Sequence, residues 1–125
     1  MTTMPTARAH TDPQYEADLR DLHSRVLALG GLIERQIANA TRAFERRDDE
    51  LAKSTIAADD EPDRMDEEIH DLCLRILALH QPTAGDLRLI TTTQRITADL
   101  ERIGDIVVNI CKRVLELNRE ATVEY

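Results

Sequence analysis

The chain has 125 residues, of which 32% are charged and only 2% are aromatic, and its formal net charge is −8. This length suits a single domain with one core, and the aliphatic, charged, aromatic-poor composition favours long helices over a sheet. The acidic balance argues against nucleic acid and against anionic membrane surfaces as partners, because both attract clustered Lys and Arg.

The first segment, residues 1–12, reads "MTTMPTARAHTD" and is expected to be a flexible lead to a helical domain at 13–125. It lacks the apolar core of a secretory signal, and no apolar run in the chain approaches the ~20 residues of a membrane span. We therefore expect a cytoplasmic protein with no direct membrane insertion.

Residues 13–47 predict the first helix, because apolar side chains recur there three and four residues apart. The positions expected to be buried are Tyr15, Leu19, Leu22, Val26, Leu29, Ile33, Ile37, Ala40 and Phe44. Gly30 and Gly31, in the middle of this segment, indicate a bend or a close contact with another helix.

A turn at "RRDDE" leads into the second helix, about residues 49–80. Asp48 or Asp49 can cap this helix by accepting hydrogen bonds from its first backbone N–H groups. Pro62 predicts a kink or a break near Glu61, because proline cannot continue the hydrogen-bond ladder of a helix.

A second turn, "HQPTAGD", precedes the third helix at about 84–118; Pro82 ends the helix before it and Thr83 can cap the next. The positions expected to be buried are Ile96, Leu100, Ile103, Val107, Ile110, Val114 and Leu117. Three helices joined by short turns predict an all-α fold, an up-down-up antiparallel three-helix bundle.

An acidic stretch, "DLERIGDIVVNI" at 99–110, borders the buried stripe of the third helix. Glu101 and Asp105 are four residues apart, so they lie one turn over the other at one border, whereas Asp99 falls at the opposite border. Gly104 costs about 1 kcal/mol relative to alanine inside a helix, so its presence requires a reason.

The second helix carries a comparable column of Asp59, Asp63, Asp66 and His70 on one side of its core stripe. Carboxylates four residues apart repel each other, and a bound cation would relieve the repulsion. Oxygen ligands of this kind suit hard cations such as Mg, Ca, Mn or ferric iron. The alternative is a solvated acidic face that forms weak surface salt bridges with nearby arginines.

Other chemistries find no support in the residues. Glu67 and His70 have the i,i+3 spacing of di-iron bundles, but only one such pair is present and Glu67 faces water. Cys73 and Cys111 both fall on apolar faces, so we interpret them as core residues rather than a disulfide or a metal pair. No phosphate-binding glycine loop, zinc spacing or activated nucleophile is visible, so we expect a protein that is not an enzyme.

Two parts of the chain resemble the PhoU family of bacterial phosphate-signalling regulators. "QPTAGDLRLI" (81–90) followed by "DLERIGDIVVNI" (99–110) resembles the family's third-helix signature, and "LAKSTIAADDEPDRMDEEI" (51–69) resembles its second. The resemblance covers about residues 15 to 118 and implies one three-helix repeat. Family members bind metal on the bundle surface through Glu/Asp-x-x-x-Asp motifs, so the expected cofactor is iron, zinc, manganese or magnesium.

The motif is matched by Glu101 and Asp105 on the third helix and by Asp59 and Asp63 on the second, so the resemblance makes these four residues the predicted metal ligands. Gly104 then gains a reason, because a bare backbone beside Asp105 lets a neighbouring helix or a metal shell come close.

The resemblance also implies a function. The family couples a phosphate ABC transporter, through its ATPase subunit, to a membrane sensor histidine kinase and acts as a negative regulator of phosphate-starvation genes. Family members usually carry two three-helix repeats and this chain shows one, so we expect a homodimer; a half-length member and a truncated reading frame both stay open. The alternative function is a metal-free helical protein-interaction module.

Overall fold

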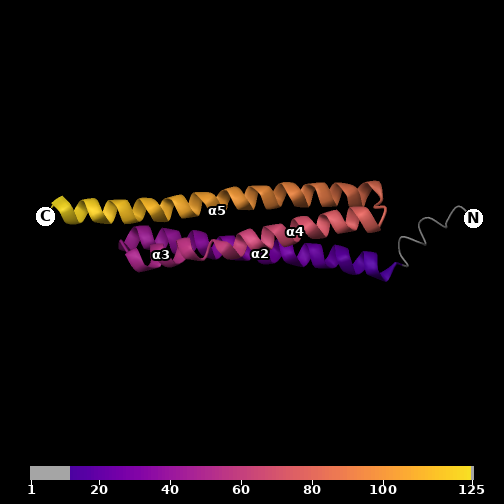
Figure 1. The fold of residues 1–125 in the computed structure, drawn as a ribbon, viewed down its shortest axis with the longest axis horizontal. Coiled ribbons are helices and arrows are strands. Elements are labelled where there is room, and N and C mark those ends of the chain that lie inside the picture. The colour runs from indigo at the N-terminus through magenta and orange to yellow at the C-terminus, as the bar shows by residue number, and fades with distance from the viewer. Residues whose placement is uncertain (1–11, 125) are drawn as a thin grey trace, which may run out of the picture.

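The computed structural model describes residues 12–124, with side chains described as far as residue 120. Its helices are α2 (Pro13–Arg46), α3 (Asp49–Ala57), α4 (Asp60–Leu79) and α5 (Ala84–Glu124). The chain runs up along α2, down along α3 and α4, and up again along α5 (Figure 1). The predicted all-α, up-down-up three-helix bundle is confirmed, with the middle leg divided in two. Residues 1–11 of the predicted flexible lead lie outside the described part.

Side-chain caps set where these helices begin. Asp12 accepts hydrogen bonds from the backbone N–H groups of Gln14 at 3.1 Å and Tyr15 at 3.2 Å. Asp48 accepts one from Leu51 at 3.0 Å, and Thr83 accepts one from Asp86 at 3.2 Å. The predicted caps of the second and third legs are therefore confirmed as Asp48 and Thr83, and each depends only on residues within one helical turn.

The middle leg corrects the single helix predicted over 49–80. The break falls at Ala58 and Asp59, just ahead of the expected position near Glu61. Pro62 is the third residue of α4, where proline is tolerated because the first N–H groups of a helix have no intrahelical partner. Pro62 therefore lies in the first turn of a new helix.

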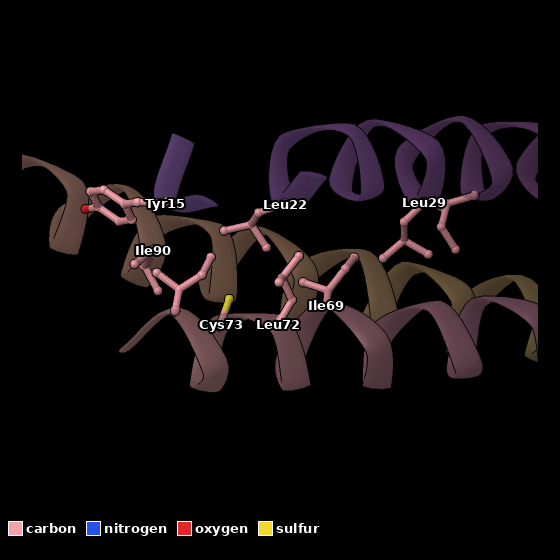
Figure 2. Packing of buried hydrophobic residues seen from close by; sticks show 9 residues of the cluster. Tyr15, Leu22, Leu29, Ile69, Leu72, Cys73 and Ile90 are labelled. Carbon is pink, nitrogen blue, oxygen red and sulfur yellow. The ribbon is translucent and has the colours of Figure 1, made fainter. Parts of the chain in front are cut away.

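Two clusters of buried side chains form the core, one under each part of the middle leg. Figure 2 shows the first cluster, where Tyr15, Leu22 and Leu29 of α2 point toward α4 and the start of α5. The second cluster is built largely from small residues of α2, α3 and α5: Ala40, Ala43, Ala52, Val107, Cys111 and Val114. Cys73 and Cys111 are free and buried, which confirms their prediction as core residues.

Five residues predicted to be buried are instead substantially exposed. They are Ile37 (43% exposed), Phe44 (57%), Ile96 (44%), Ile110 (40%) and Leu117 (51%). All five belong to α2 or α5, and each leg of a three-helix bundle can bury only the stripe that faces the other two. Helical periodicity correctly identified them as apolar positions, but it could not show that the bundle leaves a second stripe uncovered. Within residues 12–124, no helix is long and apolar enough to cross a membrane.

Candidate functional site

Carboxylates of α4 and α5 come together along one side of the bundle. This acidic edge consists of Asp59, Asp63, Asp66, Glu101 and Asp105. The Asp66 charge is the largest cause of a raised pKa for Glu101, followed by partial burial and by the charges of the other three aspartates. The four predicted metal ligands therefore share one electrostatic field within a single chain, and Asp66 belongs with them.

Burial adds to this repulsion at the ends of the acidic edge nearest the core. Burial is the first cause of the raised pKa of Asp59, with the charges of Asp63, Asp105 and Asp60 adding to it and Lys112 opposing them. Asp59 directly precedes α4, and its side chain makes no capping hydrogen bond there. Its carboxylate is thus free of the local role that Asp12 and Asp48 perform.

Asp66 has a different neighbour, His70. Burial is again the first cause of its raised pKa; His70 opposes the shift, while Asp63 and Glu67 add to it. A hollow of about 190 Å³ between α4 and α5 is lined by Asp66, His70 and Glu101 together with Gln94 and Thr97. The spacing of the sequence placed Asp66 and His70 on the same side as Asp63, yet neither belonged to the predicted ligand set.

Gly104 lies where α5 comes close to both α2 and Asp59. A Cβ atom added at Gly104 would lie 3.4 Å from Ile33 Cδ1 and 3.9 Å from Asp59 Oδ1. The close approach of a neighbouring helix expected here is found, and that helix is α2. Because both distances are ordinary van der Waals contacts, the approach accommodates an alanine methyl as well.

The donor chemistry of the acidic edge fits a hard cation, because it offers only carboxylate oxygens and their charges repel one another. The arrangement is open, however. Among the side chains described between residues 12 and 120, no three Asp, Glu, His or Cys groups are placed to hold one ion. Asp63, Glu101 and Asp105 are exposed, so their side chains are free to rotate toward a bound ion.

A second polar cluster, absent from the sequence-based prediction, lies at the end of the bundle where α2 begins. We call it the terminal network: Asp18, His80, Tyr15 and Asp86. Asp18 is only 4% exposed; it accepts hydrogen bonds from Gln14 Nε2 at 2.8 Å and Arg75 at 3.3 Å, and it lies 3.0 Å from His80 Nε2.

The terminal network has the opposite electrostatic character. Burial disfavours the Asp18 carboxylate, but the hydrogen bonds from His80 and Gln14 and the charge of Arg75 outweigh burial and lower its pKa. The Tyr15 hydroxyl donates to Asp86 at 2.5 Å, and its ring packs against His80 with centroids 5.1 Å apart. Burial, followed by this hydrogen bond, raises the pKa of Tyr15. One signal was available: Asp18 falls on the buried stripe between Tyr15 and Leu22.

Comparison with known proteins places this fold. The family model described as "PhoU domain" matches residues 26–114. The chain belongs to the PhoU family. The match contains the whole acidic edge, as well as His80 and Asp86 of the terminal network, while Tyr15 and Asp18 precede it.

Individual members of the PhoU family agree with this assignment. The chain is 39% identical over 107 residues to the phosphate-specific transport system accessory protein PhoU of Escherichia coli K12, covering 86% of this chain and 44% of the relative. It is 43% identical over 107 residues to the PhoU homologue of Clostridium acetobutylicum, covering 85% and 49%. The crystal structure of PhoU from Pseudomonas aeruginosa superposes with a TM-score of 0.82 at 40% identity, covering 85% of this chain and 51% of that one. The chain therefore spans about half the length of these PhoU proteins.

Proposed function

We propose that this PhoU-family chain is a cytoplasmic, metal-binding adaptor that negatively regulates phosphate uptake and phosphate-starvation signalling. The observation that carries the proposal is the family match over residues 26–114, joined to relatives named as accessory proteins of phosphate-specific transport. An adaptor role agrees with long helical faces, which are suited to packing against helices of other proteins.

In this proposal the acidic edge holds the metal. Glu101, Asp105, Asp59 and Asp63 would supply carboxylate oxygens to iron, zinc, manganese or magnesium, with Asp66 adjoining them. The raised pKa values of Asp59 and Glu101 support this role, because a cation would offset the repulsion that raises them. The bound ion would supply positive charge that draws α4 and α5 together at this edge.

Elemental analysis of the purified chain tests the metal directly. We expect bound iron, zinc, manganese or magnesium that is lost in Asp105→Asn and Glu101→Gln with helical content unchanged. Asp99→Asn is the matched control, because Asp99 is exposed on the same helix and forms an i,i+3 ion pair with Arg102 away from the acidic edge. A metal-free wild-type chain would instead favour the alternative function, a helical protein-interaction module.

The regulatory role is tested separately, in a strain of the source bacterium that lacks this gene. We expect phosphate-starvation genes to be expressed in phosphate-rich medium and to be repressed again when the chain is restored. Purified chain should bind the ATPase subunit of the phosphate transporter and the cytoplasmic part of the sensor histidine kinase. Failure to repress and to bind either partner would exclude the adaptor role, whatever metal the protein carries.

A further inference from the structure

An apolar groove follows the contact between α2 and α5 on the side where neither α3 nor α4 contributes to its lining. Near one end it is a hollow of about 670 Å³ lined by residues that include Val26, Leu27 and Gly30 of α2 and Leu89 and Ile96 of α5. Among its described lining residues, His23 and Glu34 are the only ionisable ones. The groove is therefore suited to an apolar occupant.

The same pair of helices forms a second hollow of about 510 Å³ toward the other end, where Phe44 lies near Val114 and Leu117. Ile37 and Ile110 lie between the two hollows along their helices and are 43% and 40% exposed. The uncovered apolar surface thus extends over most of the length of the α2–α5 pair.

Along α5 the exposed residues repeat with a regular spacing. Large aliphatic side chains occur every seventh residue, at Leu89, Ile96, Ile103, Ile110 and Leu117. A seven-residue apolar repeat sustained over four intervals is typical of a helix that packs against another helix, not of a solvated face. Because the core of this chain uses a different stripe of α5, through Ile90, Val107, Cys111 and Val114, the helix carries two packing stripes and covers one.

The two adjacent glycines of α2 lie in this groove and have no role inside the chain. A Cβ atom added at Gly30 would meet nothing within 4 Å, and one at Gly31 would meet only an Arg35 nitrogen at 3.9 Å. Neither a bend nor an internal close contact explains them, because α2 continues through both. Glycines that lower helix propensity without an internal reason are explained if a side chain from outside packs against the bare backbone.

We propose that the α2–α5 groove is the surface through which two copies of this chain form a homodimer. The family relatives are about twice as long as the aligned region, so two copies supply about the length that one relative has in a single chain. A symmetric dimer also meets the chemistry of the groove, because each copy offers apolar side chains such as Leu27 and Ile96 and a glycine floor to receive them. This inference does not depend on metal binding or on the regulatory role.

Mass measurement by light scattering during size-exclusion chromatography tests the proposal on the full chain. We expect twice the chain mass of 14.2 kDa from micromolar to sub-millimolar concentrations. Ile96→Glu, which puts a charge into the groove, should convert the dimer to a monomer with unchanged helical content. Leu74→Glu is the matched control, since Leu74 is 50% exposed on α4 outside the groove, and it should stay dimeric.

A second variant acts without adding charge. Gly30→Leu fills the floor of the groove without meeting any atom of its own chain, so the monomer should keep its fold while dimer dissociation increases about tenfold or more. A wild-type monomer at all concentrations would overturn the proposal, even if that monomer bound a transporter subunit through the same groove. A dimer that Ile96→Glu and Gly30→Leu leave intact would overturn it as well.

Chemical protection locates the interface independently. Cys73 and Cys111 are buried, so a cysteine introduced at exposed Thr92 in the groove provides the readily alkylated thiol. We expect alkylation of Thr92→Cys to slow about tenfold when the protein is concentrated from the monomeric to the dimeric range, while exposed Ser54→Cys on α3 reacts at a constant rate. Equal rates at both concentrations would place the interface elsewhere.

Discussion

The terminal network and the acidic edge both gather carboxylates between helices, yet they do so with opposite consequences. At the terminal network, Asp18 is nearly inaccessible to solvent and has hydrogen bonds and opposite charge around it, so its pKa falls. At the acidic edge, Asp59, Asp66 and Glu101 are more accessible but have mainly other carboxylates as neighbours, so their pKa values rise.

The difference teaches that burial alone does not decide the state of a carboxylate. A buried group with three partners is ionised and holds distant helices together, whereas a half-exposed group among like charges is destabilised in its ionised form. Structural and functional carboxylates can be distinguished on this basis, because repulsion that no residue of the chain relieves is what a ligand could relieve. The terminal network therefore stabilises the fold, and the acidic edge is the candidate for binding.

The largest expected effect comes from removing the centre of the terminal network. Asp18→Ala leaves His80 and Gln14 without their shared acceptor in a buried site, so we expect the free energy of unfolding to fall by about 3 kcal/mol. Urea denaturation measures it. Asp21→Ala, which removes an exposed i,i+4 partner of Arg25, should cost less than about 0.5 kcal/mol. Equal losses in the two variants would show that Asp18 is not a structural centre.

Tyr15→Phe should have the next largest effect. It removes the hydrogen bond from the Tyr15 hydroxyl to Asp86 and keeps the ring that packs on His80, so we expect a loss of about 1.5 kcal/mol. A double-mutant cycle with Asp86→Asn isolates this interaction. Additive losses in the cycle would mean that the hydroxyl and the carboxylate do not interact in solution.

The pH dependence of stability should show both regions at once. The raised pKa values of Asp59, Asp66 and Glu101 mean that their repulsion is present at neutral pH and is relieved as the pH falls through those values, which lie above the ordinary 3.8 and 4.5. The lowered pKa of Asp18 means that its contribution is complete above 3.8 and is lost as the pH falls below it.

We therefore expect the free energy of unfolding to rise on mild acidification and then to fall at lower pH. Chemical denaturation across the pH range measures both limbs. Asp59→Asn should flatten the first rise, and Asp18→Ala should remove the part of the second fall that Asp18 causes. A stability that only declines from neutral pH downward would contradict the raised pKa values of the acidic edge.

The smallest expected effect is the gain from neutralising one member of the acidic edge. Asp59→Asn removes a charge that faces Asp63 and Asp105, so without metal we expect stabilisation of about 0.5 kcal/mol. Thermal unfolding in the presence of a chelator detects it. The gain should become a loss when saturating manganese or iron is added, because only the wild-type chain then gains the binding energy of the metal.

Much of the fold could be predicted because its determinants are local. The caps at Asp48 and Thr83, the apolar periodicity and the length of each leg depend on residues within a few positions of one another. The column of Asp59 and Asp63 and the pair of Glu101 and Asp105 were also predictable, since helical geometry alone places residues four apart on one side.

Other features escaped prediction because they depend on how the helices pack. Nothing near Asp18 in the sequence indicated that His80, 62 residues away, would lie beside it. Asp66 was visible on the same side of α4 as Asp63, but its charge reaches Glu101 only because α4 lies against α5. The exposure of Ile37, Phe44 and Ile96 likewise depends on the absence of a helix over the α2–α5 groove in the described chain.

By itself, the sequence determined the helices, their caps, their apolar stripes and the two acidic columns, because these follow from contacts within one or two helical turns. Tertiary structure alone decided which stripe each helix buries, which carboxylates meet partners and which meet each other. The physical reason is that burial and charge interaction depend on distance in space, and the bundle brings together side chains that the chain separates by 60 residues or more.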